Sequence, residues 1–245
     1  MNNTPVWQMY EQQTGERVGA AVTAAGDING DGYSDFAIGA HLYDVASGSG
    51  EEGRVRVFYG NASGAPSVPG QILQPSTTFH YGETLAAGDL NGDGFSDLVV
   101  GSPFAESALT DEGLIWIHYG SAAGVGGSYN FTLRGESADR NLGGALASSG
   151  DLNADGYADL VIASRLGAAN GQDGDVDIYL GGGGGGLPRT RRQMRFDGAA
   201  PIGLLGFSES NDYSSVTMVG HSPGGRRALI GLEVQQNYFG SDFDT

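Results

Sequence analysis

The stretch Asp27-Ile28-Asn29-Gly30-Asp31-Gly32-Tyr33-Ser34-Asp35 decides the fold, because close copies of it occur three times in the chain. The second copy runs from Asp89 to Asp97 and the third from Asp151 to Asp159. The first aspartates are evenly spaced, since 89 − 27 and 151 − 89 both give 62 residues. A fixed period of this length indicates a repeat protein in which each unit forms one supersecondary element.

Each copy carries oxygen-bearing side chains at positions 1, 3, 5 and 9 and a glycine at position 6. Calcium takes about six to eight oxygen ligands, and a tight glycine turn allows one short loop to surround it. We therefore predict three Ca²⁺ sites, in which position 7 contributes its backbone carbonyl. The predicted ligands are Asp27, Asn29, Asp31, Tyr33 and Asp35; Asp89, Asn91, Asp93, Phe95 and Asp97; and Asp151, Asn153, Asp155, Tyr157 and Asp159.

The loop differs from an EF-hand loop, which lies between helices and places a glutamate at position 12. Position 12 here is Ile38, Val100 or Ile162, each in a short apolar run that predicts a buried strand. The aspartate at position 9 is therefore expected to close the site. A metal-free turn rich in aspartate and glycine is the alternative interpretation. Three copies in register favour calcium.

Four short apolar or alternating segments recur in every unit, and we interpret them as four strands. One precedes the aspartate loop and one follows it, the third begins near Gly53, Gly113 or Gly174, and the fourth comprises Gln71–Leu73, Phe131–Leu133 or Gln193–Phe196. Four-stranded units repeated radially are the blades of a β-propeller. We predict one all-β domain over residues 1–245, a β-propeller of about four blades at 15–75, 78–134, 139–197 and 201–245.

The fourth unit is degenerate, because it has no aspartate ladder and no predicted calcium site. Its strands are expected at 204–207, 216–221 and 226–232. Residues 4–10 precede the first unit as a fourth strand would, so they are expected to complete the last blade with Trp7 as a core anchor. That closure gives a four-bladed ring without an exposed edge. The alternative is a part of a larger propeller.

The order of these motifs resembles the FG-GAP repeat of integrin alpha-chain propellers, which also occurs in bacterial surface and secreted proteins. It reads Val-Gly, Tyr-Gly or Leu-Gly, then the ladder, then Gly-Ala-His or Gly-Ser-Pro, and it covers residues 1–187. No copy retains Phe-Gly before the ladder, and the third has Ala163-Ser164-Arg165 where Gly-Ala-Pro is expected. The resemblance implies a calcium-binding propeller, and seven blades for the larger ring.

Composition excludes several classes of protein. With 29 acidic and 12 basic residues and a net charge of −17, the chain is unsuited to binding nucleic acid or anionic membranes. No apolar run approaches the roughly 18 residues that insert into a membrane. Cysteine is absent, so disulfides and cysteine-based zinc sites are excluded. The histidines are scattered in the sequence without the spacing of a zinc site: His41, His80, His118 and His221.

The first ten residues lack the charged and apolar regions of a signal peptide. Either a leader has been removed or the chain is a piece of a longer protein. We expect an extracellular or cell-surface location, because weak calcium loops are filled at extracellular calcium levels.

We predict a non-enzymatic adhesion or recognition module without catalytic residues. The long polar loops that differ between units join the second and third strands and are expected to contact a protein or glycan ligand. They are Leu42–Glu52, Phe104–Glu112 and Leu166–Asp173. Two alternatives stay open: a secreted enzyme or an accessory domain of a hydrolase or lyase, and a structural subunit that self-associates through incomplete blade edges.

Overall fold

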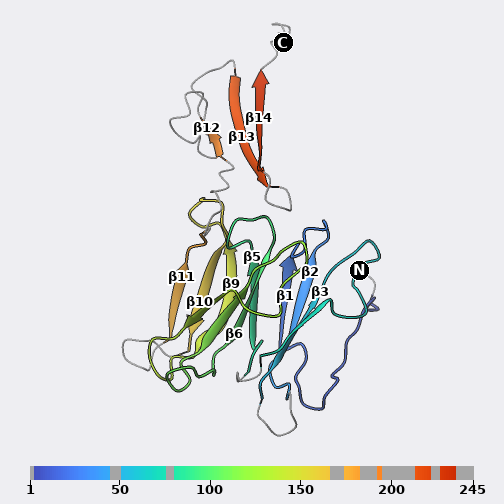
Figure 1. Cartoon of the computed structure of the whole chain (residues 1–245), viewed down its shortest axis with the longest axis vertical. Helices are drawn as coiled ribbons and strands as arrows, with labels where there is room; N and C mark the ends of the chain where they lie inside the picture. The colour runs from blue at the N-terminus through green and yellow to red at the C-terminus, as the bar shows by residue number, and fades with distance from the viewer. Residues whose placement is uncertain are drawn as a thin grey trace, which may run out of the picture.

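The computed structural model describes residues 3–44, 51–75, 80–165, 174–182, 192–194, 213–221 and 227–235. Every regular element in these ranges is a β-strand, and the strands form two four-stranded and two three-stranded sheets (Figure 1). None of these ranges contains a helix that is long and apolar enough to cross a membrane. The predicted fold class is confirmed: the chain is an all-β protein with four-stranded antiparallel sheets of the propeller type.

The first two repeat units fold as predicted, each into a sheet whose strands lie in sequence order. The first sheet contains β1 (Ala21–Gly26), β2 (Asp35–Ala40), β3 (Arg54–Phe58) and β4 (Gln71–Leu73). The second contains β5 (Thr84–Gly88), β6 (Asp97–Ser102), β7 (Leu114–His118) and β8 (Phe131–Arg134). In both sheets the aspartate loop connects the first strand to the second, and all pairs are antiparallel.

The third unit differs from the prediction. Its sheet has three strands, β9 (Leu142–Gly150), β10 (Asp159–Ser164) and β11 (Asp175–Tyr179). The expected fourth strand, β12 (Arg192–Met194), pairs instead with β13 (Tyr213–His221), which pairs with β14 (Arg227–Gln235). Six consecutive glycines at 181–186 lie between β11 and β12 in the sequence, and glycine imposes little restriction on the backbone conformation. Within the fourth unit, the strands expected at 216–221 and 226–232 overlap β13 and β14, whereas 204–207 lies outside the described residues.

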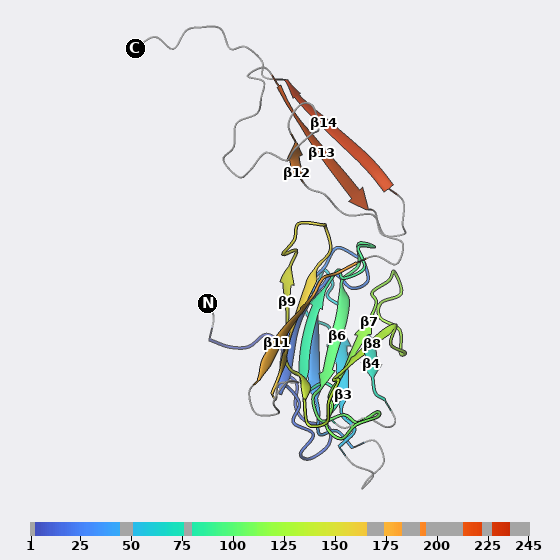
Figure 2. The same cartoon turned by 90° about the vertical axis from the view of Figure 1, so that its left-hand side faces the viewer.

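The core lies between neighbouring sheets, whose first strands β1, β5 and β9 are adjacent (Figures 1 and 2). Successive side chains of a strand point to opposite faces of its sheet. Accordingly, Leu98 and Trp116 belong to the apolar cluster shared with the first sheet, while Val99 and Ile115 belong to the cluster that includes Ile162 of the third sheet. The second sheet is therefore buried on both faces, which explains why its strands are apolar almost throughout.

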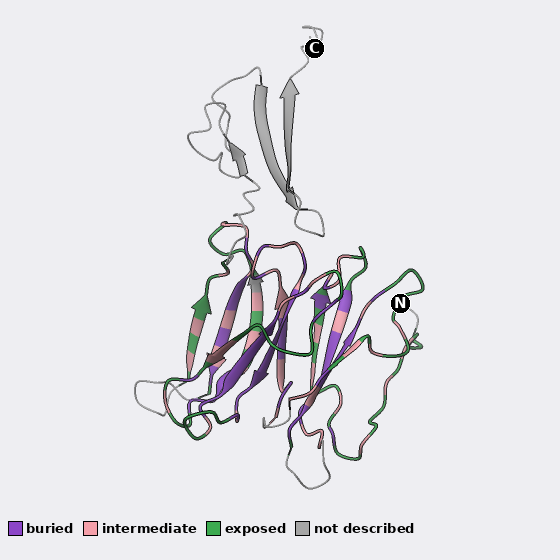
Figure 3. Ribbon diagram, in the orientation of Figure 1, coloured by how far each residue is buried: buried purple, intermediate pink, exposed green. Residues whose placement is uncertain are grey.

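The outer faces of the first and third sheets are more open. Val22 of β1 pairs with Ile38, and Leu85 occupies the equivalent position opposite Val100. The side chain of Val22 is 63% exposed and that of Leu85 only 9%. On the far side, β11 is exposed along most of its length (Figure 3). These are the faces that a neighbouring sheet covers in the middle unit.

The N-terminal segment packs on the outer face of the first sheet instead of forming a strand. Residues 4–10 are not a strand, in contrast to the prediction. The indole of Trp7 meets the rings of Phe36 and Phe58 edge-on at 5.4 and 5.3 Å, and its Nε1 donates to the carbonyl of Pro66 at 2.9 Å. Trp7 is thus a packing residue of the first blade. Burial of this aromatic surface holds the segment against the first sheet.

Candidate metal centres

The aspartate loops hold the side chains of positions 1, 3 and 5 on the inside of one turn. In the first loop, the carboxylate of Asp27 accepts hydrogen bonds from the backbone amides of Asp31 at 3.1 Å and Gly32 at 2.9 Å. The side-chain amide of Asn29 donates to the carboxylate of Asp31 at 3.0 Å. The third loop repeats these bonds at Asp151, Asn153 and Asp155. In the second loop Asn91 likewise donates to Asp93, while the carboxylate of Asp89 accepts the amides of Gly92 and Gly94. The structure therefore brings together three predicted ligands in each loop.

The aspartate at position 9 has a second contact that the sequence did not indicate. Asp35 is buried, and its two oxygens accept the backbone amides of Ile28 and Gly60, both at 2.8 Å. The carboxylate therefore ties the loop to the end of the third strand. The same pair of bonds is made by Asp97 with Leu90 and Gly120, and by Asp159 with Leu152 and Gly181. In the second loop, Oδ2 of Asp97 also accepts the amide of Asn91 at 3.3 Å. The predicted function of position 9 as the closing ligand stays a prediction.

The electrostatics of these loops suit a divalent cation. Burial raises the pKa of Asp35, and the neighbouring charges of Asp31 and Asp27 add to the rise. Burial likewise raises the pKa of Asp97 to about 7, against the effect of its amide hydrogen bonds. A cation would offset this repulsion and favour the charged carboxylates. Because all the side-chain donors are carboxylate or amide oxygens, the residues fit a hard ion such as Ca²⁺.

Position 7 supplies packing between units as well as a predicted carbonyl ligand. The side chains of Phe95 and Tyr157 are buried, whereas Tyr33, at the outer face, is exposed. The ring of Tyr157 covers Gly92 in the preceding loop so closely that a Cβ there would lie 2.4 Å from a ring atom. Glycine at this position therefore lets one loop seat the aromatic side chain of the next. Coordination through the carbonyls of position 7 stays a prediction.

Backbone hydrogen bonds also join neighbouring loops. The carbonyl oxygen of Asp27 accepts the amide of Ser96, and that of Asp89 accepts the amide of Ala158. Position 1 of one loop is thus bonded to position 8 of the next loop in both cases.

Three glycines at the ends of the third strands support the loops, and sequence reasoning missed their function. Gly60, Gly120 and Gly181 donate their amides to the position-9 aspartates. A Cβ on Gly120 would lie 2.3 Å from the carbonyl oxygen of Ser96 and 2.8 Å from that of Ile28. Only glycine lets these backbones approach so closely. The signal that could have found them is the glycine that closes the third strand in all three units.

Of the three loops predicted to contact a protein or glycan, Phe104–Glu112 borders a groove of about 500 Å³. Glu106 and Ser107 of the loop Phe104–Glu112 line it together with Tyr81, Trp116, His118 and Tyr129. The loop is held in place because the buried carboxylate of Glu112 accepts the amides of Ser107 and Ala108 at 2.7 and 2.8 Å. Of the other two predicted ligand loops, Leu42–Glu52 is described only at its ends and Leu166–Asp173 lies outside the described residues.

The floor of this groove is a buried aromatic pair. The hydroxyl of Tyr81 lies 2.7 Å from Nε2 of His118. Burial lowers the pKa of His118 to about 4 and raises the pKa of Tyr81 above its usual range. Both side chains are therefore neutral near pH 7.

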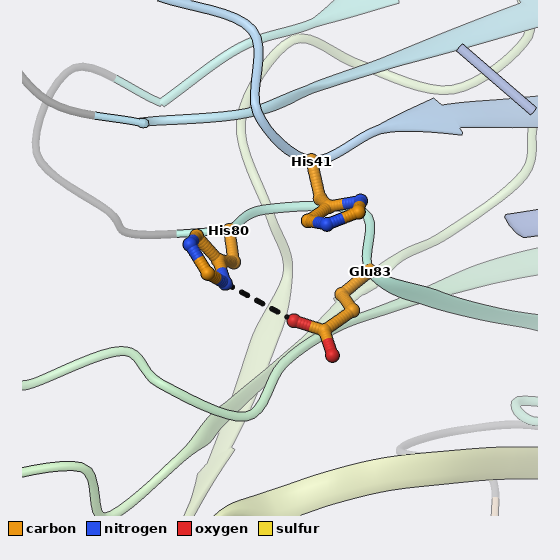
Figure 4. Close-up of side chains that lie close together, drawn as sticks. All are labelled: His41, His80 and Glu83. Atoms are coloured by element: carbon orange, nitrogen blue, oxygen red, sulfur yellow. Dashed lines mark hydrogen bonds and ion pairs between the residues drawn. The ribbon is translucent and has the colours of Figure 1, made fainter. Parts of the chain in front are cut away.

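The fold also assembles a cluster that the sequence spacing concealed. His41, which follows β2, and His80, which precedes β5, lie beside Glu83 (Figure 4). Nδ1 of His80 is 3.2 Å from the carboxylate of Glu83, and this hydrogen bond raises the pKa of His80. Burial lowers the pKa of His41. These two histidines are therefore adjacent in the structure, although they lie 39 positions apart in the sequence, from 41 to 80.

Comparisons with known proteins agree with the repeat. A family model described as FG-GAP repeat matches residues 18–58 and 81–118. The chain is 37% identical over 163 residues to phosphatidylinositol-glycan-specific phospholipase D of Rattus norvegicus, an alignment that covers 62% of this chain and 19% of that protein. It is 36% identical over 169 residues to integrin alpha-4 of Xenopus laevis, covering 66% of this chain and 16% of the integrin.

Integrin alpha-V of Gallus gallus is 32% identical over 162 residues, covering 62% of this chain and 15% of the integrin. The chain thus spans a fifth or less of the length of these relatives. The family match falls on the first two sheets and includes their aspartate loops. The chain therefore carries FG-GAP repeats and is related, through this part, to integrin alpha chains and to phosphatidylinositol-glycan-specific phospholipase D.

Proposed function

We propose that this chain is an extracellular calcium-binding propeller domain that acts as a recognition module for protein or glycan ligands. The observation that carries this proposal is the set of three equivalent loops, each with three oxygen-bearing side chains on the inside of one turn. FG-GAP repeats of the integrin type generally bind Ca²⁺. The proposed domain comprises residues 1–245, with blades at 15–75, 78–134, 139–197 and 201–245.

In each proposed site the side chains of positions 1, 3, 5 and 9 and the carbonyl of position 7 would hold the ion. Bound calcium neutralises the clustered carboxylates of the loop. The ordered loop would then hold the first and second strands in register. The position-9 aspartate in addition ties this loop to the end of the third strand. An extracellular location is supported by the partial exposure of the loops, since weak sites of this kind are filled at extracellular calcium levels.

Chelation tests the calcium part of the proposal. At a free calcium concentration 100 times Kd, one site stabilises the folded state by about 2.7 kcal/mol, and each kcal/mol shifts the Tm of a domain of this size by about 2–4 °C. We expect EDTA to lower the Tm by about 5 °C or more, and added Ca²⁺ to restore it. An unchanged Tm would contradict the proposal, and Mg²⁺ at equal concentration is the matched control ion.

The groove beside Phe104–Glu112 is the proposed ligand surface. It offers the exposed ring of Tyr129 and the polar side chains of Glu106 and Ser107, a combination suited to sugar rings or peptide side chains. We expect Tyr129→Ala to abolish binding on a glycan or extracellular-protein array without changing the Tm. Tyr10→Ala removes another exposed tyrosine that does not line this groove, so the binding of this variant should match that of the wild type.

A second candidate function rests on the phospholipase D relatives. Because the alignments cover about a fifth of those proteins, this chain would correspond to an accessory domain and not to a complete enzyme. A screen of hydrolytic activity on polysaccharides and phosphoesters distinguishes a recognition module from an enzyme. Activity that is lost when residues outside the aspartate loops are changed would favour an enzyme. Self-association through incomplete blade edges is a third outcome, which light scattering with and without calcium would detect.

A further inference from the structure

A second kind of metal site is built where the first and second sheets meet (Figure 4). One ring nitrogen of His41, one of His80 and a carboxylate oxygen of Glu83 all lie within 4.8 Å of one another. Imidazole nitrogens are poor ligands for calcium, but two histidines and a carboxylate are a common donor set for zinc. We propose that these three residues bind one Zn²⁺ ion, with water as the fourth ligand, at a site separate from the calcium loops.

His80 is held in the orientation that a metal ligand needs. Its Nε2 lies 2.8 Å from the carboxylate of Glu51, which leaves Nδ1 directed toward Glu83. A histidine that binds a metal through one nitrogen usually donates its other N–H to a carboxylate or carbonyl, which fixes the ring. Glu51 already occupies the place of that supporting carboxylate.

Glu83 is likewise oriented by a residue outside the cluster. Its Oε1 accepts a hydrogen bond from Arg165 at 2.5 Å, so Oε2 is the oxygen that faces His80. The guanidinium of Arg165 also lies 4.9 Å from the centre of the Phe104 ring, against whose edge His80 packs. Because Arg165 follows β10, the support for this ligand comes from the third sheet.

His41 is the residue that the zinc site explains best. Its side chain is buried, and its Nδ1 has no hydrogen-bond partner among the described residues. Buried polar groups in proteins are normally paired. Its ring instead meets the ring of His80 edge-on, with 5.3 Å between the centroids. Coordination by one ring nitrogen would supply the specific polar interaction that this buried imidazole otherwise lacks.

The spacing of the donors fits a tetrahedral zinc ion. With bonds of about 2.0 Å, two zinc ligands lie about 3.3 Å apart. The distance between Nδ1 of His80 and Oε2 of Glu83 is 3.2 Å. The nitrogen of His41 lies within 4.8 Å of the other two donor atoms, and the partial exposure of His80 and Glu83 gives an ion access from solvent. The bound ion would tie the end of β2 to the start of β5.

Titration of the full chain with ZnCl₂ in saturating Ca²⁺, followed by isothermal calorimetry, tests this site. We expect one zinc ion per chain in the wild type, bound at least about 10-fold more weakly by His41→Gln and Glu83→Gln and roughly 10-fold more weakly by Glu51→Gln. Glu136→Gln is the matched control for Glu83→Gln, since it removes an exposed carboxylate that does not belong to the cluster and should bind like the wild type. With Co²⁺ as a probe, absorption bands of a tetrahedral ion should appear in the wild type and be lost in His41→Gln.

Two results would overturn the proposal. Absence of zinc binding by the wild type would leave His80 as an ion-pair partner of Glu83 and Glu51 only. Zinc affinities of His41→Gln and Glu83→Gln that both equal the wild-type affinity would show that zinc binds elsewhere. If near-ultraviolet circular dichroism shows that His41→Gln does not fold, Glu83→Gln decides, because its side chain is partly exposed. Since the calcium loops contain no histidine, either result is independent of the calcium proposal.

Discussion

The carbonyl oxygen of Asp27 accepts a hydrogen bond from the backbone amide of Ser96 at 3.0 Å, which joins the first aspartate loop to the second. The same bond joins the second loop to the third, between Asp89 and Ala158 at 2.9 Å. The three loops therefore form a continuous series and not three independent turns. A cation that orders one loop also orders the backbone that its neighbour contacts.

The second loop, which has a neighbour on each side, gives the sharpest test of this coupling. We expect Asp93→Ala to abolish one of three calcium sites and to weaken the remaining two, because their loops lose a rigid contact. Calorimetric titration with Ca²⁺ measures both the number of sites and their affinities. Glu136→Gln removes an exposed carboxylate outside the loops and should leave the titration unchanged. Retention of three sites in Asp93→Ala would contradict the assignment of the ligands.

Gly120→Ala should destabilise the domain although it adds only one methyl group. The added Cβ would overlap the carbonyl oxygens of Ser96 and Ile28, and relief would require moving the amide that donates to Asp97. We expect a loss of about 2 kcal/mol or more in the free energy of unfolding, measured in urea. Gly126→Ala is the control, because a Cβ there would meet nothing closer than 3.7 Å. Equal losses in both variants would show that the loop contact is unimportant.

The buried ion pair between Glu16 and Arg56 makes the N-terminal segment necessary for stability. The two side chains are 2.9 Å apart and almost fully buried. Glu16→Ala leaves the Arg56 charge buried without its carboxylate, so we expect a loss of about 3–5 kcal/mol in the free energy of unfolding. Replacing both residues, with Glu16→Leu and Arg56→Met, should cost less than the single change. A double variant as unstable as Glu16→Ala would contradict this account.

Acid should destabilise the domain through His118. Its pKa is about 4 in the folded chain and about 6.5 when unfolded, so the unfolded chain takes up the proton first. The stabilisation is complete above pH 6.5 and is lost as the pH falls toward 4, by an amount on the order of 3 kcal/mol. Urea unfolding at pH 7 and pH 5 in saturating Ca²⁺ measures it. In His118→Gln, the decrease between the two pH values should be clearly smaller, and an identical decrease would assign the effect to other groups.

The architecture was predictable because one ladder recurs with a constant period. Apolar runs after each ladder identified β2, β6 and β10, and alternation identified β3, β7 and β11. The predictions that were wrong concerned contacts between segments far apart in the sequence. Residues 4–10 were predicted to form a strand, yet Trp7 packs on Phe36 and Phe58 of the first sheet, which lie 29 and 51 positions away in the sequence, from 7 to 36 and from 7 to 58. Similarly, no local sequence pattern indicated that β12 pairs with β13.

The candidate sites likewise differ in whether their residues are close together in the sequence. Ligands at positions 1, 3 and 5 lie within five residues, so local spacing was enough to group them. The buried hydrogen bond that the amide of Gly60 donates to Asp35 joins residues 25 positions apart, from 35 to 60. The contact between His41 and His80 joins residues 39 positions apart, from 41 to 80. The first contact arises from the pairing of β2 with β3 within one sheet, and the second from the packing of the first sheet against the second. Local patterns in one sequence do not indicate which strands pair or which sheets pack against each other.

The contrast between Leu85, 9% exposed, and Val22, 63% exposed at the equivalent position, has a consequence for how the molecule opens. In a repeat array each unit is stabilised chiefly by its neighbours, so stability falls from the interior toward the ends. Among the first three sheets, the second alone is covered on both faces. Amide hydrogen exchange should therefore be slowest in β6 and β7 and faster in β1 and β11, so that unfolding proceeds from the outer blades inward.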